Sequence, residues 1–96
     1  MKQLEQDSES EYKVIEDLTE KVKEKAIHIY NFPKEVEIKE AKLTLHPHDG
    51  YVVIIKYNMD GIDYEDKRVV ITKLTDIVDD MLFRIKDFYE RIHVLE

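Results

Sequence analysis

The sequence predicts an α+β domain in the order α-β-β-β-α, with a three-stranded antiparallel meander and two helices packed on one face. Three observations predict it: apolar residues recur at helical spacing towards both ends, they alternate in the middle, and two Asp-Gly pairs separate the alternating segments. No repeat or linker divides the 96 residues. We therefore expect residues 1–8 to form a flexible N-terminus and residues 9–96 to form a single domain.

The first helix is predicted over about residues 9–30. Ser8 and Glu11 have the spacing of a capping box, and Asn31 and Pro33 are typical of a helix stop. Apolar residues lie on one predicted helical face at Tyr12, Ile15, Leu18, Val22, Ala26 and Ile29.

Hydrophobic alternation then predicts strands. Ala41, Leu43 and Leu45 alternate with polar residues, whereas Val36 and Ile38 alternate in the opposite parity. Either a β-bulge lies near residues 39–40, or residues 36–38 belong to a separate short extension. Two further strands are predicted from residues 51–57 and from the run at 69–71.

Asp49-Gly50 and Asp60-Gly61 are typical of two-residue type I′ turns, because glycine adopts positive φ at little cost. The first turn would place Leu45 opposite Ile54 and Leu43 opposite Lys56. The second would place Lys56 opposite Glu65, Tyr57 opposite Tyr64, and Val52 opposite Val69.

A second helix is predicted to begin after a cap at Thr72 or Thr75, with aspartates near its positive N-terminal end. Its wide apolar face comprises Leu74, Ile77, Val78, Met81, Leu82, Ile85, Phe88, Tyr89 and Ile92.

Composition excludes several classes of protein. The chain has no cysteine, which excludes disulfides, thiol nucleophiles and thiolate metal sites. It has no apolar run long enough to span a membrane and no signal-peptide core, so we expect a cytoplasmic protein without membrane contact. The net charge is −7.

His46, His48 and Asp49 are the residue types that zinc or copper binds, and they suggest a small metal-dependent or acid–base enzyme as one alternative. A polar hairpin tip is the ordinary interpretation and is preferred. No nucleophile constellation or glycine-rich phosphate loop is present. The preferred expectation is a non-enzyme with no catalytic residues, no metal and no cofactor.

The predicted order of elements is also that of double-stranded-RNA-binding domains, whose second helix opens with lysines that contact phosphates. Here the corresponding residues 75–80 include three aspartates, which would repel phosphates. The order is too common to assign a family, and we expect no direct binding of nucleic acid.

The sheet supplies the candidate interface. If Leu43, Leu45, Val52, Ile54, Val69 and Ile71 pack under the helices, apolar residues also line the other face. The predicted interface residues there are Tyr51, Val53, Ile55, Tyr57, Tyr64 and Arg68, with Val70 beside them. The alternative is that this face packs on the N-terminal extension or reflects strand propensity alone.

The leading hypothesis is a small acidic interaction domain whose sheet face contacts another protein or a second copy of itself. A sharper version makes it an inhibitor or regulator from a phage or mobile element, which blocks a nucleic-acid-binding target by charge mimicry. The carboxylates that would mimic phosphates are Asp60, Asp63, Glu65, Asp66, Asp76, Asp79 and Asp80. A homodimeric structural or regulatory subunit is a further alternative.

Overall fold

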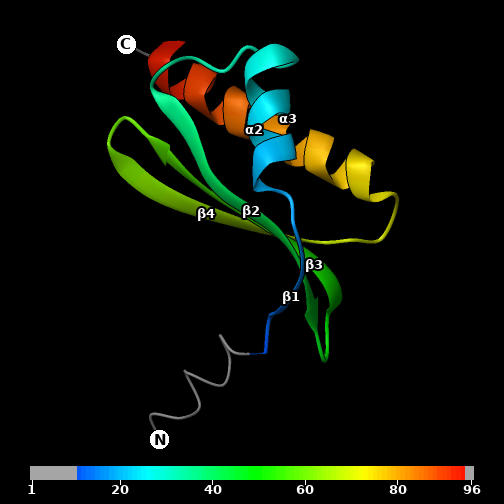
Figure 1. Cartoon of the computed structure of the whole chain (residues 1–96). Helices are drawn as coiled ribbons and strands as arrows, with labels where there is room; N and C mark the ends of the chain where they lie inside the picture. Colours follow the sequence, from blue (N-terminus) through cyan, green and yellow to red (C-terminus); the bar gives the residue numbers. More distant parts are fainter. Residues whose placement is uncertain (1–10, 95–96) are drawn as a thin grey trace, which may run out of the picture.

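A computed structural model describes residues 11–94 as a four-stranded antiparallel sheet with two helices (Figure 1). The elements in chain order are β1 (Lys13–Asp17), α2 (Thr19–His28), β2 (Val36–His46), β3 (Gly50–Met59), β4 (Ile62–Val69) and α3 (Leu74–Val94). The strands lie side by side in the order β1-β2-β3-β4. The predicted α+β class is confirmed, but the sheet has one strand more than the predicted meander.

The additional strand, β1, replaces the first two turns of the predicted first helix. It pairs with β2, with Val14 opposite Thr44 and Asp17 opposite Lys42. The helix begins only at Thr19, with Leu18 as its N-cap residue, and just before it the Oδ1 atom of Asp17 accepts hydrogen bonds from the backbone N–H (2.9 Å) and hydroxyl (2.6 Å) of Thr19. The prediction of a helix from residue 9 is therefore wrong. The expected flexible residues 1–8 and the Ser8 cap lie outside the described residues.

The helix ends close to its predicted stop. Asn31 has a φ of 53°, in the left-handed region, and the backbone N–H of Phe32 donates to the carbonyl of Ala26 at 2.9 Å. The chain then enters β2, where the pairing with β3 shifts between Ile38 and Glu40. Of the two interpretations of residues 36–40, the bulge is therefore confirmed.

The hairpin between β2 and β3 differs from the prediction and reverses the faces of the sheet. Its pairing ends at His46 opposite Gly50, so the loop has three residues, 47–49, and not two. The Nδ1 atom of His46 accepts hydrogen bonds from the backbone N–H groups of His48 and Asp49, at 3.1 Å each, which favours this longer loop. Leu45 consequently lies opposite Tyr51 and Leu43 opposite Val53, against the predicted partners Ile54 and Lys56.

The hairpin between β3 and β4 follows the prediction. Asp60 and Gly61 both have positive φ, 55° and 84°, as a type I′ turn requires. The confirmed pairs are Lys56 with Glu65, Tyr57 with Tyr64, and Val52 with Val69.

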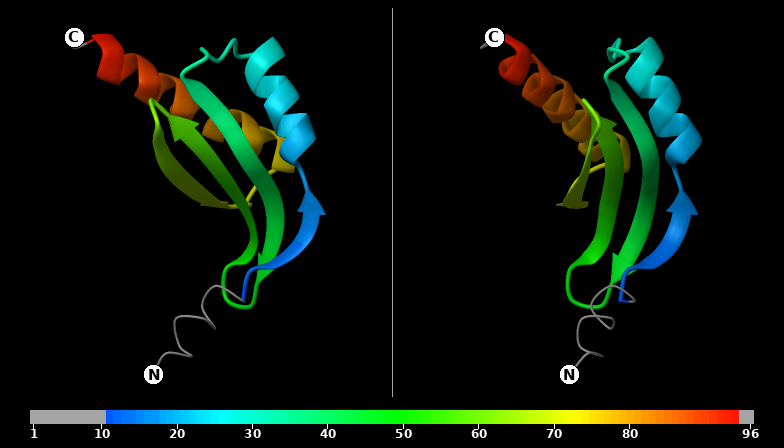
Figure 2. Two further views of the ribbon diagram at one scale, coloured as in Figure 1. Left: turned by 60° about the vertical axis from the view of Figure 1, so that its left-hand side comes forward. Right: turned by 90° about the vertical axis from the view of Figure 1, so that its left-hand side faces the viewer.

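Both helices pack against one face of the sheet, and α3 crosses behind it in Figure 1 (see also Figure 2). The buried residues of the predicted α3 stripe are Ile77, Val78, Met81, Leu82 and Ile85. From α2 the core takes Val22 and Ala26, and from β3 it takes Val53, Ile55, Tyr57 and Met59. Neither helix in residues 11–94 has an apolar stretch that could cross a membrane.

Candidate protein-interaction surface

The face of the sheet that the sequence suggests as an interface is the inside of the protein. Val53 and Ile55 are fully buried and Tyr57 is 4% exposed, all under the two helices. Tyr64 and Arg68 are half-buried on the same side, and Tyr51 alone of the predicted set is exposed. The expectation of an outward apolar face is therefore wrong, because the three-residue loop after His46 shifts β2 against β3 and exchanges the two sides.

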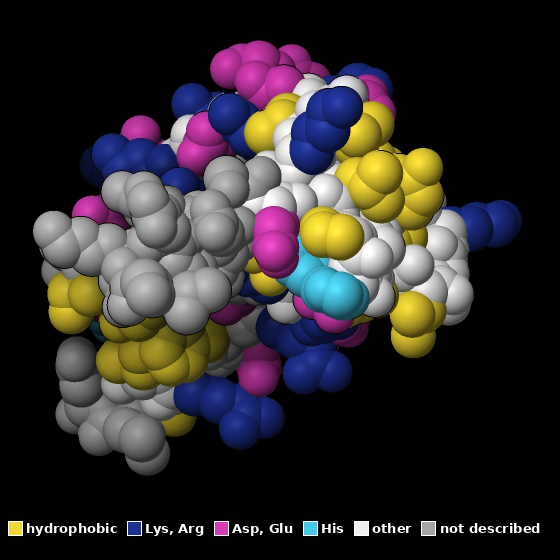
Figure 3. Space-filling view, turned by 90° about the horizontal axis from the view of Figure 1, so that it is seen from below, with side chains coloured by type: hydrophobic (Ala, Val, Ile, Leu, Met, Phe, Trp, Pro, Cys, Tyr) yellow, Lys and Arg dark blue, Asp and Glu magenta, His cyan; other side chains and the backbone are white. Residues whose placement is uncertain are grey.

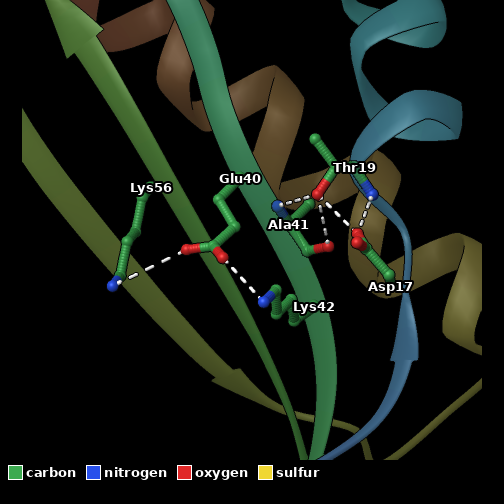
Figure 4. Close-up of polar contacts among 6 residues, drawn as sticks. All are labelled: Asp17, Thr19, Glu40, Ala41, Lys42 and Lys56. Carbon is green, nitrogen blue, oxygen red and sulfur yellow. Dashed lines mark hydrogen bonds and ion pairs between the residues drawn. The ribbon is translucent and has the colours of Figure 1, made fainter.

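The open face carries charged side chains that pair with one another. The carboxylate of Glu40 lies 2.8 Å from the Nζ atom of Lys42 and 3.7 Å from that of Lys56 (Figure 4). The bond to Lys42 lowers the pKa of Glu40 and raises that of Lys42. Of the residues expected under the helices, Ile54 and Val69 lie on this open side and Ile71 is 81% exposed. Val52, also expected under the helices, lies on the same side as Ile54 but is 2% exposed, opposite the buried Thr44. The ion pairs thus occupy only the solvated part of this face.

At the junction between β1 and α2, a single hydroxyl joins three segments of backbone. Besides its bonds to Asp17, the Oγ1 atom of Thr19 accepts a hydrogen bond from the backbone N–H of Ala41 at 3.1 Å (Figure 4). Ala41 follows the bulge and is fully buried, so its N–H cannot turn to solvent. The bulge and the start of α2 are thereby held together, which is a structural role.

The histidines of the hairpin tip are used by the hairpin itself. Besides its bonds to the loop backbone, His46 lies with its Nε2 atom 3.1 Å from Oε1 of Glu11. Both ring nitrogens are thus engaged, and residues 11–94 contain no group of three potential ligands that could hold a metal ion. The geometry gives the metal or acid–base alternative at His46, His48 and Asp49 no support.

The predicted acidic surface is divided between the two ends of α3. Asp60 lies 3.0 Å from the Nε2 atom of His93, near the C-terminal end, whereas Asp79 lies 2.7 Å from the Nζ atom of Lys25, near the N-terminal end. Asp79 and His93 are 14 residues apart on α3, which corresponds to about 21 Å along the helix. On the face drawn in Figure 3, acidic side chains lie among basic and hydrophobic ones. Glu65 and Asp66 are neighbours on β4 and point to opposite faces of the sheet, so the seven carboxylates do not share one face.

A groove of about 480 Å³ lies between α2 and the start of α3. Its apolar lining includes Leu18, Val22, Ile29, Leu74 and Val78. Its rim carries acidic and basic side chains in similar number, such as Glu24 and Lys25. Nothing in this lining selects one chemical class of ligand.

The outer edge of β4 is the surface whose geometry points most directly to a partner. Among residues 11–94, β4 pairs only with β3, over eight regular residue pairs from Met59–Ile62 to Val52–Val69, with no bulge. The backbone N–H of Val70 donates to the carbonyl of Tyr51 at 2.8 Å, so even-numbered residues direct their backbone groups towards β3. The odd-numbered residues therefore direct theirs to the open edge, and these are Asp63, Glu65, Lys67 and Val69. Figure 2 shows β4 at the edge of the sheet.

Side chains behind this edge hold β4 firmly against the core. Tyr64 stacks on Tyr57 with ring centroids 5.3 Å apart and meets Phe88 of α3 edge-on at 5.6 Å. Arg68 donates from Nη1 to the Oδ2 atom of Asp80 at 2.6 Å, and the Nε atom of Arg84 donates to the same oxygen at 2.9 Å. The hydrogen bonds from both arginines lower the pKa of Asp80. These contacts give the edge a fixed shape before any partner arrives.

Comparison of the whole chain with protein-family models, curated proteins and solved structures gives no match. The predicted meander, with the strand around residues 51–58 at its centre, already places β4 at an edge of the sheet, but the predicted interface is a face of the sheet and not this edge.

Proposed function

We propose that the protein is a non-catalytic protein-interaction domain that binds its partner by adding a strand to the open edge of β4. The single observation that supports this proposal is the regular eight-residue edge, whose outward backbone donors and acceptors have no strand beside them among residues 11–94. An extended segment can satisfy those groups by continuing the ladder, while side chains on the edge select the partner.

The other edge of the sheet is less suitable. β1 has five residues, and its pairing with β2 is interrupted by an irregularity between Val14 and Glu16. Short and bulged edges are the usual means by which proteins prevent unwanted pairing. β4 has neither feature, although it carries charged side chains that restrict which strands can pair with it.

A proline at position 67 tests this proposal. Lys67→Pro removes an outward N–H without removing a bond to β3, whereas Lys67→Ala removes the same side chain and keeps the N–H. We expect proteins retained from a lysate of the native host by the wild type and by Lys67→Ala to be lost with Lys67→Pro. Equal retention by all three, with equal circular dichroism, would contradict binding through β4.

Charge mimicry of nucleic acid is a second candidate, favoured by the net charge of −7. It ranks below strand addition, because the carboxylates lie in separate groups and Asp79 and Asp80 are paired with cations of this chain. Binding of a basic target by mimicry would weaken steeply as salt concentration rises. Affinity that does not change with salt would exclude it.

A further inference from the structure

The backbone of β4 restricts how this strand could pair with a copy of itself. A pair related by a two-fold axis is antiparallel and places the same segment on both sides of the axis. Because only odd-numbered residues direct hydrogen-bonding groups outward, odd residues must lie opposite odd residues. The axis must then pass through a residue, and Glu65, Asp66 and Lys67 are the positions that keep most of β4 paired.

The charge pattern favours the axis at Asp66. On the open face, this axis places Glu65 of each copy opposite Lys67 of the other. On the helix-facing side it places Tyr64 opposite Arg68, again twice. An axis at Glu65 or at Lys67 would instead set two identical charges opposite each other within the hydrogen-bonded pairs.

Each of the three axes brings together one pair of like charges. At the Asp66 axis, the surroundings of the two carboxyls reduce their repulsion. Asp66 is half-buried and faces Tyr57 on β3, and Arg68 of its own strand lies beside it. Burial raises the pKa of Asp66, so its carboxyl accepts a proton more readily than an exposed one.

We infer that β4 pairs with β4 of a second copy of this chain, antiparallel and centred on Asp66, joining the two sheets into one. This inference rests on the proposed function, because it names the partner of the same edge. The side chains next to the edge fit a second copy: Ile62 is 56% exposed and Phe88 is 37% exposed beside Tyr64. An arriving strand would cover part of this apolar surface.

Charge reversal in single and mixed variants tests the inference. Glu65→Lys sets two Lys–Lys contacts across the axis, and Lys67→Glu sets two Glu–Glu contacts. We expect each variant alone to raise the dimer Kd about tenfold or more, as measured by sedimentation equilibrium. A mixture of the two restores opposite charges at both contacts, so we expect a heterodimer of near wild-type affinity. Circular dichroism and thermal unfolding of each variant check that it folds.

The outcomes separate this inference from the proposed function. Dimerisation of the wild type, its loss in each single variant and its recovery in the mixture support pairing at Asp66. Single variants that dimerise like the wild type, or a mixture that does not associate, overturn it. A wild type that stays monomeric also overturns self-pairing. In that case, capture of a protein that Lys67→Pro abolishes would leave the proposed function standing, and capture unaffected by Lys67→Pro would remove both.

Discussion

Tyr57 is a polar side chain placed in the core, where it is 4% exposed under the two helices. Burial, and then the nearby charges of Asp66 and Tyr64, raise the pKa of its phenol from 10.0 to about 12. Because the folded pKa is the higher one, the neutral phenol's contribution to stability is complete below pH 10.0 and is lost as the pH rises through about 12.

Replacing this phenol gives a prediction for alkaline conditions. We expect Tyr57→Phe to remove the tyrosine that ionises last in an ultraviolet absorbance titration and to reduce the loss of stability above pH 10.0. Tyr51→Phe is the matched control, because Tyr51 is 51% exposed on the same strand. If the late titration persisted in Tyr57→Phe, this account of the buried phenol would be wrong.

Thr19 acts at the scale of the elements, since its hydroxyl connects β1, α2 and the bulge of β2. Thr19→Val keeps the shape of the side chain and leaves the buried N–H of Ala41 without an acceptor. We expect the free energy of unfolding to fall by about 1–3 kcal/mol in chemical denaturation. Thr19→Ser keeps the hydroxyl and is expected to lose much less; equal losses in both variants would contradict the hydrogen-bond argument.

The loop between β2 and β3 decides which face of the sheet is buried, and Gly50 closes it with a φ of 80°. A Cβ at position 50 would meet no neighbouring atom, so any cost of Gly50→Ala comes from the backbone. We expect Gly50→Ala to lower stability by about 1–2 kcal/mol and Gly50→Asn to lower it less, because asparagine tolerates this conformation better. Equal stability of wild type and Gly50→Ala in thermal unfolding would show that the loop does not need positive φ.

The elements differ in how far the sequence predicts them. α3 and the Asp60-Gly61 hairpin follow from local chemistry alone, since a long apolar stripe and an Asp-Gly pair between alternating segments leave few alternatives. β1 is missed because residues 12–18 also fit a helical stripe. Asp17, whose carboxylate accepts a hydrogen bond from the backbone N–H of Thr19, is the local signal for the true helix start.

The same limit applies to the candidate site. Asp49-Gly50 fits a two-residue turn by composition, and the three-residue loop depends on hydrogen bonds to the ring of His46 that the pattern does not specify. A change of this kind moves every side chain of β3 to the opposite face relative to β2. The β3–β4 pairs and the edge position of β4 follow from the predicted meander, whereas the buried face depends on the register between β2 and β3.

Across the whole molecule, carboxylates that are hydrogen-bonded and carboxylates that are buried change the stability of the fold in opposite directions as the pH falls. The hydrogen bonds of Asp17, Glu40 and Asp80 lower their pKa values, so the stability that these groups contribute is present above their unfolded pKa values and is lost as the pH falls through the folded ones. Asp66 has the reverse sign: burial raises its pKa, so ionisation disfavours the folded state as the pH rises.

The inferred dimer should therefore depend on pH through Asp66. The two Asp66 carboxylates meet at the axis, and each faces Tyr57 and Arg68 of its own chain. The guanidinium of Arg68 donates to Asp80 of α3, which also accepts a hydrogen bond from Arg84. We expect wild-type association to strengthen as the pH falls from neutral towards the raised pKa of Asp66, because these carboxylates become protonated.

Asp66→Asn places a neutral side chain of the same shape at the axis and isolates this effect. We expect it to associate more tightly than the wild type at neutral pH, with a Kd that changes little with pH in sedimentation equilibrium. Asp63→Asn, whose position lies opposite Val69 in the inferred pairing, should retain the wild-type pH dependence. An unchanged pH dependence in Asp66→Asn would place the axis at another residue, because only a pair at the axis brings two copies of the same carboxyl together.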